Sequence, residues 1–433
     1  MKKIIVEIKN LTSLEKVFLI FLGLSEIYYF YRYIFRFSSS ISPIGYILTP
    51  FWLQLGKFVL VFVFFVIMAI FILSKFKWSE IVKQFSKKIF WFPVLLFVLY
   101  FALSLLKFTN HWDNYGFTQS LKMLFVIPVL FFIPFIWKDK SPFSFLKIFL
   151  VFSIVYNLLY NFIMIGLFYS IGRLPGLAFS DILGRFGGGW DDPNGFAAFI
   201  VLLIAVLLVI RSDKLKGKFY WYYAILLSLL IISLIYTFSV TGLVGLFVVI
   251  VLFFFFKKLS WKKFLPIPII GILFTIIFYY LNYFFLIYYG KLGSSAGHLN
   301  ITSVQTANLS IIGIIGKVIF GSTTNIVFLE NFYIQFFNNF GLVGVTLLAF
   351  ILGLTTFRAF KGYSKTERDK EPQKKIIFLI SGVYLVAFVI MNAVIPIFQD
   401  FPMNLFVWVL IGIVWILQIK DYDKPAELIR SEK

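Results

Sequence analysis

Two arginines flank a glycine-rich segment that could bind a phosphorylated ligand. Residues 185–195 read Arg-Phe-Gly-Gly-Gly-Trp-Asp-Asp-Pro-Asn-Gly, and Arg173 lies shortly before them. A planar guanidinium binds phosphate oxygens in bidentate fashion, and backbone N–H groups of a glycine-rich turn can hold the same anion. Arg173 and Arg185 are therefore predicted to bind a diphosphate. Ion pairs with Asp181 or Asp191 are the alternative role for these arginines.

The end of the same segment is typical of a helix start. Asparagine is a favoured N-cap, and Pro193 favours an extended Asp192, so a helix is expected to begin after Asn194. Asp191 and Asp192 would then complement the helix dipole. Their alternative role is contact with a glycan, and Asp191, Asp192 and Asn194 are predicted to bind glycan or to position the loop.

A second polar segment, 289–331, offers groups that could move a proton. Glu330 is the preferred candidate for a general base, and His298 is the second, because its imidazole titrates near neutral pH. The structural alternatives are a solvated His298 and a Glu330 that stabilises a helix N-terminus. The other residues predicted to contact substrate in this region are Asn331, Tyr333, Lys291 and Lys317.

The remaining polar groups are predicted to be structural. The turn Ser239-Val-Thr-Gly242 is expected to cap two helix ends. Glu26 is expected at the membrane interface, satisfied by Arg or Tyr neighbours, and binding of a ligand near the outer interface is its alternative role. Asp421-Tyr-Asp423 is interpreted as a solvated tail, and neither a metal site nor a cofactor is predicted.

The elements that carry these residues are predicted to be membrane-spanning helices. The 433 residues are 61% hydrophobic with a mean hydropathy of +0.94, far from the composition of soluble domains. Apolar segments long enough to cross a bilayer recur throughout, which predicts an all-α protein with a single transmembrane domain, 1–433. The twelve predicted spans are 17–36, 58–74, 89–106, 121–137, 145–169, 195–210, 219–238, 241–256, 265–288, 332–357, 376–396 and 401–419.

The net charge of +21 is explained by membrane orientation. With a cytoplasmic N-terminus, most Lys and Arg residues fall in inner loops, as the positive-inside rule requires. This topology makes both termini cytoplasmic, places 170–194 and 289–331 outside, and excludes nucleic acid as a partner. The chain has no cysteine, which excludes disulfides and thiolate chemistry.

The order of three motifs resembles the bacterial O-antigen polymerase and O-antigen ligase superfamily. The matches are 185–194 ending in Asp-Pro-Asn, the Ser-x-Thr-Gly turn at 239–242, and 330–344 with Glu-Asn-x-Tyr-Ile and Asn-Phe-Gly-Leu-Val-Gly. They cover the central part of the chain, 170–345. Glu330 stands where ligases typically have histidine, which favours the polymerases.

The resemblance implies a GT-C-type membrane glycosyltransferase that acts without a metal and inverts the anomeric centre. Its substrate would be an undecaprenyl-diphosphate-linked oligosaccharide. The protein would be located in the bacterial inner or plasma membrane, and a chain-length regulator would be a further partner. Polymerases commonly have an arginine in the second loop, where this chain offers Lys291 or Lys317. A ligase and a lipid-linked oligosaccharide flippase are the alternatives.

Overall fold

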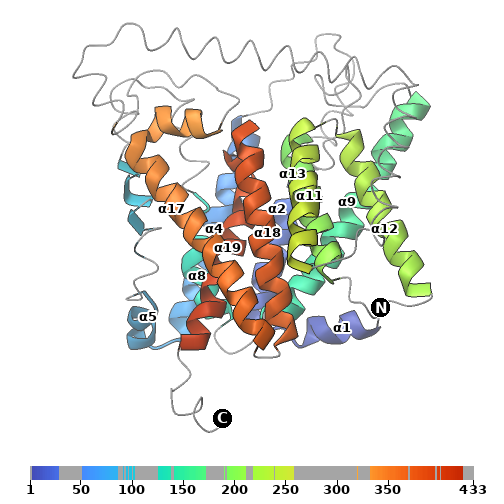
Figure 1. The fold of residues 1–433 in the computed structure, drawn as a ribbon. Coiled ribbons are helices and arrows are strands. Elements are labelled where there is room, and N and C mark those ends of the chain that lie inside the picture. Colours follow the sequence, from blue (N-terminus) through green and yellow to red (C-terminus); the bar gives the residue numbers. More distant parts are fainter. Residues whose placement is uncertain are drawn as a thin grey trace, which may run out of the picture.

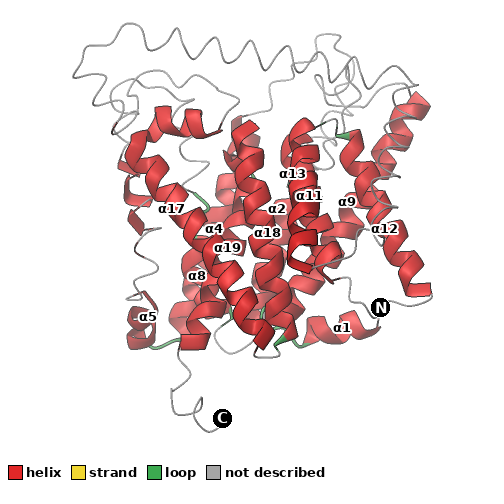
Figure 2. Ribbon diagram, viewed as in Figure 1, coloured by secondary structure: helices red, strands yellow, loops and turns green. Residues whose placement is uncertain are grey.

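The computed structural model shows a bundle of helices (Figures 1 and 2). Every secondary-structure element in the described part of the chain is helical, which confirms the all-α class. The structure describes residues 2–28, 51–85, 91, 94–95, 97–99, 101–102, 125–137, 141–171, 190, 193–210, 218–237, 239–257, 319, 332–368, 371–394, 397–399 and 401–422.

Five helices within these residues are long and apolar enough to cross a membrane. Their spanning parts are Gly56–Lys75, Phe143–Ile163, Pro193–Ile210, Phe340–Thr366 and Pro372–Ala393. An apolar helix of about 20 residues matches the hydrocarbon thickness of a bilayer. The chain is thus a membrane-embedded helical protein.

The long helices follow most of the predicted spans. They are α2 (Ser13–Glu26), α4 (Phe51–Lys75), α9 (Phe143–Ile171), α11 (Pro193–Ile210), α12 (Lys218–Tyr236), α13 (Val240–Lys257), α17 (Phe332–Arg368), α18 (Pro372–Val394) and α19 (Met403–Tyr422). Predicted span 265–288 and most of 89–106 lie outside the described residues, so the number of twelve crossings stays a prediction.

Three predicted spans differ in the structure. Span 17–36 is not one continuous helix, because α2 ends at Glu26 and neither Ile27 nor Tyr28 is helical. Within 121–137, helix is described only as α8 (Val129–Ile136), with turns before it. Pro128 occupies the N-cap position of α8 and explains its late start, since proline disfavours helical backbone in the residue before it, whereas Pro134 is accommodated inside the helix. In α17, Gly341 has φ 62° and ψ −167°, so this element consists of two helices joined by a kink. The predicted span 332–357 is therefore not one straight helix, because its first nine residues precede the kink.

Short helices lie beside the bundle. α1 (Lys2–Lys9) is held to α9 by an ion pair between Lys147 Nζ and Glu7 Oε1, 2.7 Å apart. α5 (Trp78–Phe85) is the second of these. The 3-10 turn η3 (Ile397–Gln399), in contrast, is packed inside the bundle against α11, α18 and α19.

The start of α2 is fixed by its sequence. Thr12 and Glu15 form a capping box, in which the Thr12 N–H donates to Glu15 Oε2 at 2.8 Å and the Glu15 N–H to Thr12 Oγ at 3.2 Å. This satisfies two backbone donors that the first turn would otherwise leave without partners. Local residues therefore account for the start of α2 at Ser13.

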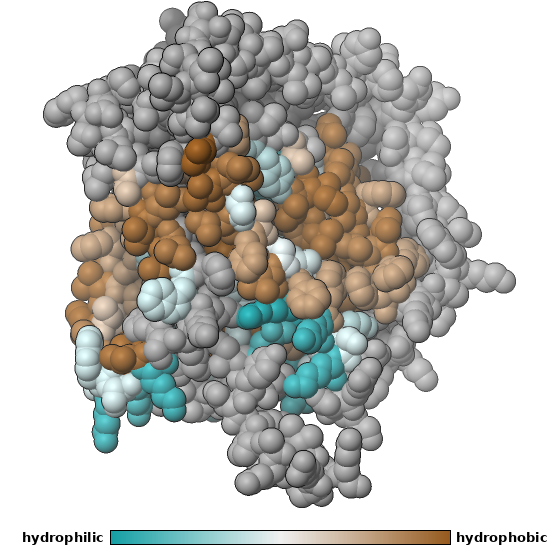
Figure 3. Space-filling view, turned by 60° about the vertical axis from the view of Figure 1, so that its left-hand side comes forward, coloured by the Kyte–Doolittle hydropathy of each residue, from teal (hydrophilic) through white to brown (hydrophobic). Residues whose placement is uncertain are grey.

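α11 and α18 form the centre of the bundle. α18 packs against α11, α13, α17 and α19, and 83% of the α11 span is buried, against 22% of the α4 span. Large apolar side chains such as Phe62, Phe247 and Phe255 are exposed on the outer helices. Figure 3 shows this surface as a broad apolar band with hydrophilic residues below it, as expected for a belt that faces lipid.

The helix directions bring the starts of α11, α13 and α17 to one end of the bundle (Figure 1). We call this the upper end, after its place in the figure. α1 and the last residues of α19 lie at the opposite, lower end. Segments from three motifs, distant in sequence, thus share one end of the molecule.

Candidate functional site

A hydrogen bond joins two of the three motifs at the upper end. The Ser239 hydroxyl, at the start of α13, donates to Asn194 Oδ1 in the first turn of α11 at 2.8 Å. Both side chains are buried. The segment 185–194 therefore ends beside the Ser-x-Thr-Gly turn, although 45 positions separate Ser239 from Asn194.

The expected role of Asn194 as an N-cap is wrong. α11 begins at Pro193, so Asn194 is already helical. Proline suits the first helical position because its φ is fixed and its missing N–H would lack a helical partner there. The Asn194 side chain is then directed across to α13, where it accepts the Ser239 hydrogen bond.

The predicted capping role of the turn is confirmed at Ser239. Its Oγ accepts from the Gly242 N–H at 3.2 Å, the geometry of an N-cap on α13. Gly242 also permits close packing, since a Cβ there would lie 2.7 Å from the Ala197 Cβ on α11. Thr241 Oγ1 is buried nearby with no hydrogen-bond partner.

Trp190 anchors the glycine-rich segment to the bundle, a role that the sequence interpretation missed. Its indole is 2% exposed and stacks on Phe199 with ring centroids 4.9 Å apart, while Phe406 of α19 lies at 6.0 Å. A tryptophan among loop glycines was the available signal, because a buried indole contributes a large apolar area. Trp190 itself is thus packed against α11 and α19.

Tyr333, from the third motif, lies on the first part of α17. Its hydroxyl donates to the Val389 carbonyl of α18 at 2.7 Å. This bond fixes the first part of α17 against α18, and Gly341 then turns the chain into the spanning part. The predicted contact of Tyr333 with substrate stays a prediction.

The charged candidates lie outside the described residues. These are Arg173, Arg185, Asp191, Asp192, Lys291, His298, Lys317 and Glu330, together with the amide Asn331. Their predicted roles rest on the sequence. The structure does place three residues that are close to these candidates in sequence, namely Trp190, Asn194 and Tyr333.

Among the described residues, Glu26 has neither the Arg nor the Tyr partners that were expected for it. It is fully buried between α2 and α9, where Ser153 Oγ donates to its Oε2 at 2.7 Å and Asn157 Nδ2 donates to its Oε1. The partners are polar groups of α9, not Arg or Tyr neighbours. Ser153 and Asn157 are four residues apart, a spacing that places both on one helix face.

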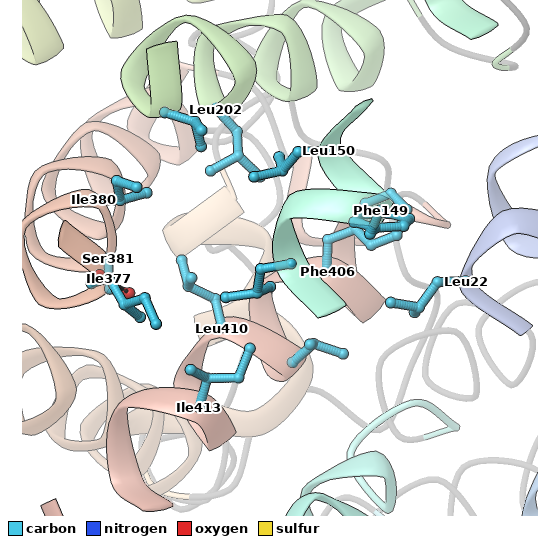
Figure 4. Close-up of a pocket in the computed structure, with 13 residues that line it drawn as sticks. Leu22, Phe149, Leu150, Leu202, Ile377, Ile380, Ser381, Phe406, Leu410 and Ile413 are labelled. Carbon is cyan, nitrogen blue, oxygen red and sulfur yellow. Dashed lines mark hydrogen bonds between the residues drawn. The ribbon is translucent and has the colours of Figure 1, made fainter. Parts of the chain in front are cut away.

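An apolar cavity of about 70 Å³ lies between α2, α9, α11, α18 and α19 (Figure 4). Among the described residues that line it, Ser381 alone is polar, and its hydroxyl donates to the Ile377 carbonyl of its own helix. A site for sugar or diphosphate needs convergent polar groups. This cavity therefore does not supply the polar part of a glycan site.

The comparisons with known proteins do not assign a family. A scan against protein-family models finds no match to this chain, and no curated protein matches it significantly. The likeness to O-antigen polymerases and ligases thus rests on the three motifs and their order.

Proposed function

We propose that this protein is a polysaccharide polymerase of the bacterial inner or plasma membrane. It joins undecaprenyl-diphosphate-linked oligosaccharide repeats on the outer face into O-antigen, capsular or exopolysaccharide chains. The reaction is a metal-independent, inverting glycosyl transfer, and the upper end of the bundle is the outer end.

The observation that supports this proposal is the Ser239–Asn194 hydrogen bond. A motif resemblance gains weight when motifs that are distant in sequence meet in space, because residues of one site must lie within reach of one substrate. Two of the three motifs touch here, and Tyr333 of the third is fixed to α18, which packs against both α11 and α13.

The reaction assigns a role to each charged candidate. A hydroxyl oxygen of the acceptor glycan attacks the anomeric carbon, and the bond from that carbon to the diphosphate oxygen breaks. Arg173 and Arg185 stabilise the negative charge that develops on undecaprenyl diphosphate. Glu330, or in its place His298, accepts the hydroxyl proton.

A flippase for the same lipid-linked oligosaccharide is the second candidate. The observation that favours it is the buried Glu26, since ionisable groups inside spans are typical of transport pathways. Against it, the three motifs are arranged around the upper end and not along the membrane interior.

Analysis of the lipid-linked intermediates in cells without the gene separates these functions. A polymerase deletion should accumulate single repeats on undecaprenyl diphosphate at the outer face and lose long polymer. Untransferred long polymer would indicate a ligase, and single repeats retained on the cytoplasmic face would indicate a flippase. Either result contradicts the proposal.

A site variant tests the diphosphate role. Arg185→Ala should abolish polymer at normal protein abundance, because a positioned guanidinium is expected to contribute about 2.7–4 kcal/mol to the transition state, or about 10²–10³ in rate. Arg211→Ala is the matched control, since the predicted topology places it on the cytoplasmic side. Wild-type polymer from Arg185→Ala would remove this arginine from the mechanism.

A further inference from the structure

The group of polar side chains between α2 and α9 has the composition of an ion-binding site. Glu26, Ser153, Asn157 and Asn161 are all fully buried. Ser153 and Asn157 bind the Glu26 carboxylate, and Asn157 also donates to the Ser153 carbonyl at 2.8 Å. We call these four residues the Glu26 cluster.

The carboxylate of this cluster lies within the membrane. Its two hydrogen-bond partners, Ser153 and Asn157, belong to the apolar part of α9 that is long enough to cross a membrane, Phe143–Ile163. The hydrocarbon core of a bilayer is about 30 Å thick. A carboxylate at this depth needs a compensating positive charge or a proton, because an isolated buried anion is strongly disfavoured.

The described part of the chain offers Glu26 no cationic partner. The Glu26 carboxylate accepts hydrogen bonds from the Ser153 hydroxyl and the Asn157 amide, which are both neutral. These two donors orient the carboxylate but leave its charge in place. A ligand that supplies one positive charge would complete the cluster.

Unused amide oxygens indicate what kind of ligand fits. Asn157 Oδ1 is buried without a hydrogen-bond partner, and so are both Oδ1 and Nδ2 of Asn161. Asn157 is placed by its bond to Glu26, so its free oxygen is a few ångströms from the carboxylate. Asn161 follows one turn later on the same face of α9, beyond the end of α2.

The end of α2 adds to this arrangement. The last backbone hydrogen bond of the helix runs from the Ile27 N–H to the Gly23 carbonyl. A helix C-terminus carries the negative end of the helix dipole, and in membrane proteins such ends help to coordinate Na⁺. The carboxylate, two amide groups and the helix end thus favour a small cation held by oxygens.

We propose that the Glu26 cluster binds one monovalent alkali cation of the size of Na⁺. Carboxylate, amide and hydroxyl oxygens are hard ligands suited to such an ion. One carboxylate balances one monovalent charge, whereas a divalent ion would leave a net positive charge inside the membrane. The bound ion ties the end of α2 to the middle of α9, and this role does not depend on the proposed polymerase activity.

Direct binding of ²²Na⁺ to the purified full-length protein in detergent tests the proposal. The wild-type protein should show saturable binding of one ion per chain at neutral pH, with N-methylglucamine chloride keeping the ionic strength constant. Thermal unfolding should shift to higher temperature in NaCl than in N-methylglucamine chloride, because an ion that binds only the folded state stabilises it. No saturable binding of ²²Na⁺ would overturn the proposal.

Variants locate the ion. Glu26→Gln keeps the shape of the side chain and removes its charge, so it should lose both ²²Na⁺ binding and the Na⁺-dependent thermal shift. Asn161→Leu should weaken binding at least about tenfold. Glu15→Gln is the matched control, since Glu15 is also a buried acid of α2 but binds only the cap, and it should keep wild-type binding. Unchanged binding in Glu26→Gln would refute the site.

Discussion

Removal of the Ser239 hydroxyl should destabilise the upper end by about 2 kcal/mol. The hydroxyl has two roles, since it caps α13 through the Gly242 N–H at 3.2 Å and donates to Asn194 Oδ1 at 2.8 Å. Loss of an N-cap costs about 1 kcal/mol. Hydrogen bonds between helices in membranes contribute about 0.6 kcal/mol on average and at most about 1.7 kcal/mol. The two contributions together give the expected total.

Reversible unfolding of purified protein by SDS in mixed micelles, followed by circular dichroism, measures this effect. Ser239→Ala should lower the free energy of unfolding by about 2 kcal/mol, and Ser239→Thr, which keeps the hydroxyl, should lower it less. Ser74→Ala is the matched control, because the Ser74 hydroxyl binds the Phe71 carbonyl at an exposed position of α4. A change within about 0.5 kcal/mol is expected for it, as for most surface substitutions.

A double-mutant cycle with Asn194→Ala separates the two contributions of Ser239. The coupling energy between the two positions should be about 0.6–1.7 kcal/mol, and the remainder of the Ser239→Ala effect then belongs to the cap. A coupling energy near zero would show that the two motifs are not joined by this bond. The support for the polymerase proposal would then be lost as well.

Two further substitutions test the structure of the upper end. Gly341→Ala should destabilise the protein by about 1–3 kcal/mol in the same assay, because only glycine readily adopts this φ and ψ. Gly353→Ala, at a helical site with no heavy atom near the added Cβ, should be neutral or slightly stabilising, and equal losses at both would contradict the kink. Trp190→Ala should cost about 3–5 kcal/mol because it empties a packed core site, whereas Trp78→Ala, at a 71% exposed position, should cost far less. A stable Trp190→Ala protein would refute the anchoring of this segment to α11 and α19.

Much of the local structure could be predicted because its causes are local. Continuous apolar segments of about 20 residues form helices in a membrane, where backbone groups must be satisfied within the segment. This reasoning located α9, α11, α12 and α18 to within a few residues. The cap at Ser239 followed in the same way, since its acceptor and donor are three residues apart.

The helix ends that were predicted wrongly depend on competition between local signals. Asn194 and Pro193 both favour a helix start, and the proline took the first helical position. In 121–137 the apolar composition predicted a full span, yet α8 begins only after Pro128. Apolar composition predicts that a segment is stable in lipid, but it does not predict whether the backbone hydrogen bonds of a helix run through the segment without a break.

The sequence by itself determined the membrane class of this protein, its main helices and the motifs that suggest glycosyl transfer. Only the tertiary structure decided which polar groups meet. The partners of Glu26 are 127 and 131 positions away on α9, and Ser239 binds Asn194 across 45 positions. Hydropathy reports how a residue interacts with lipid or water, whereas these contacts depend on which helix faces pack together. For that reason Glu26, predicted as an interfacial residue, became the centre of a buried polar cluster.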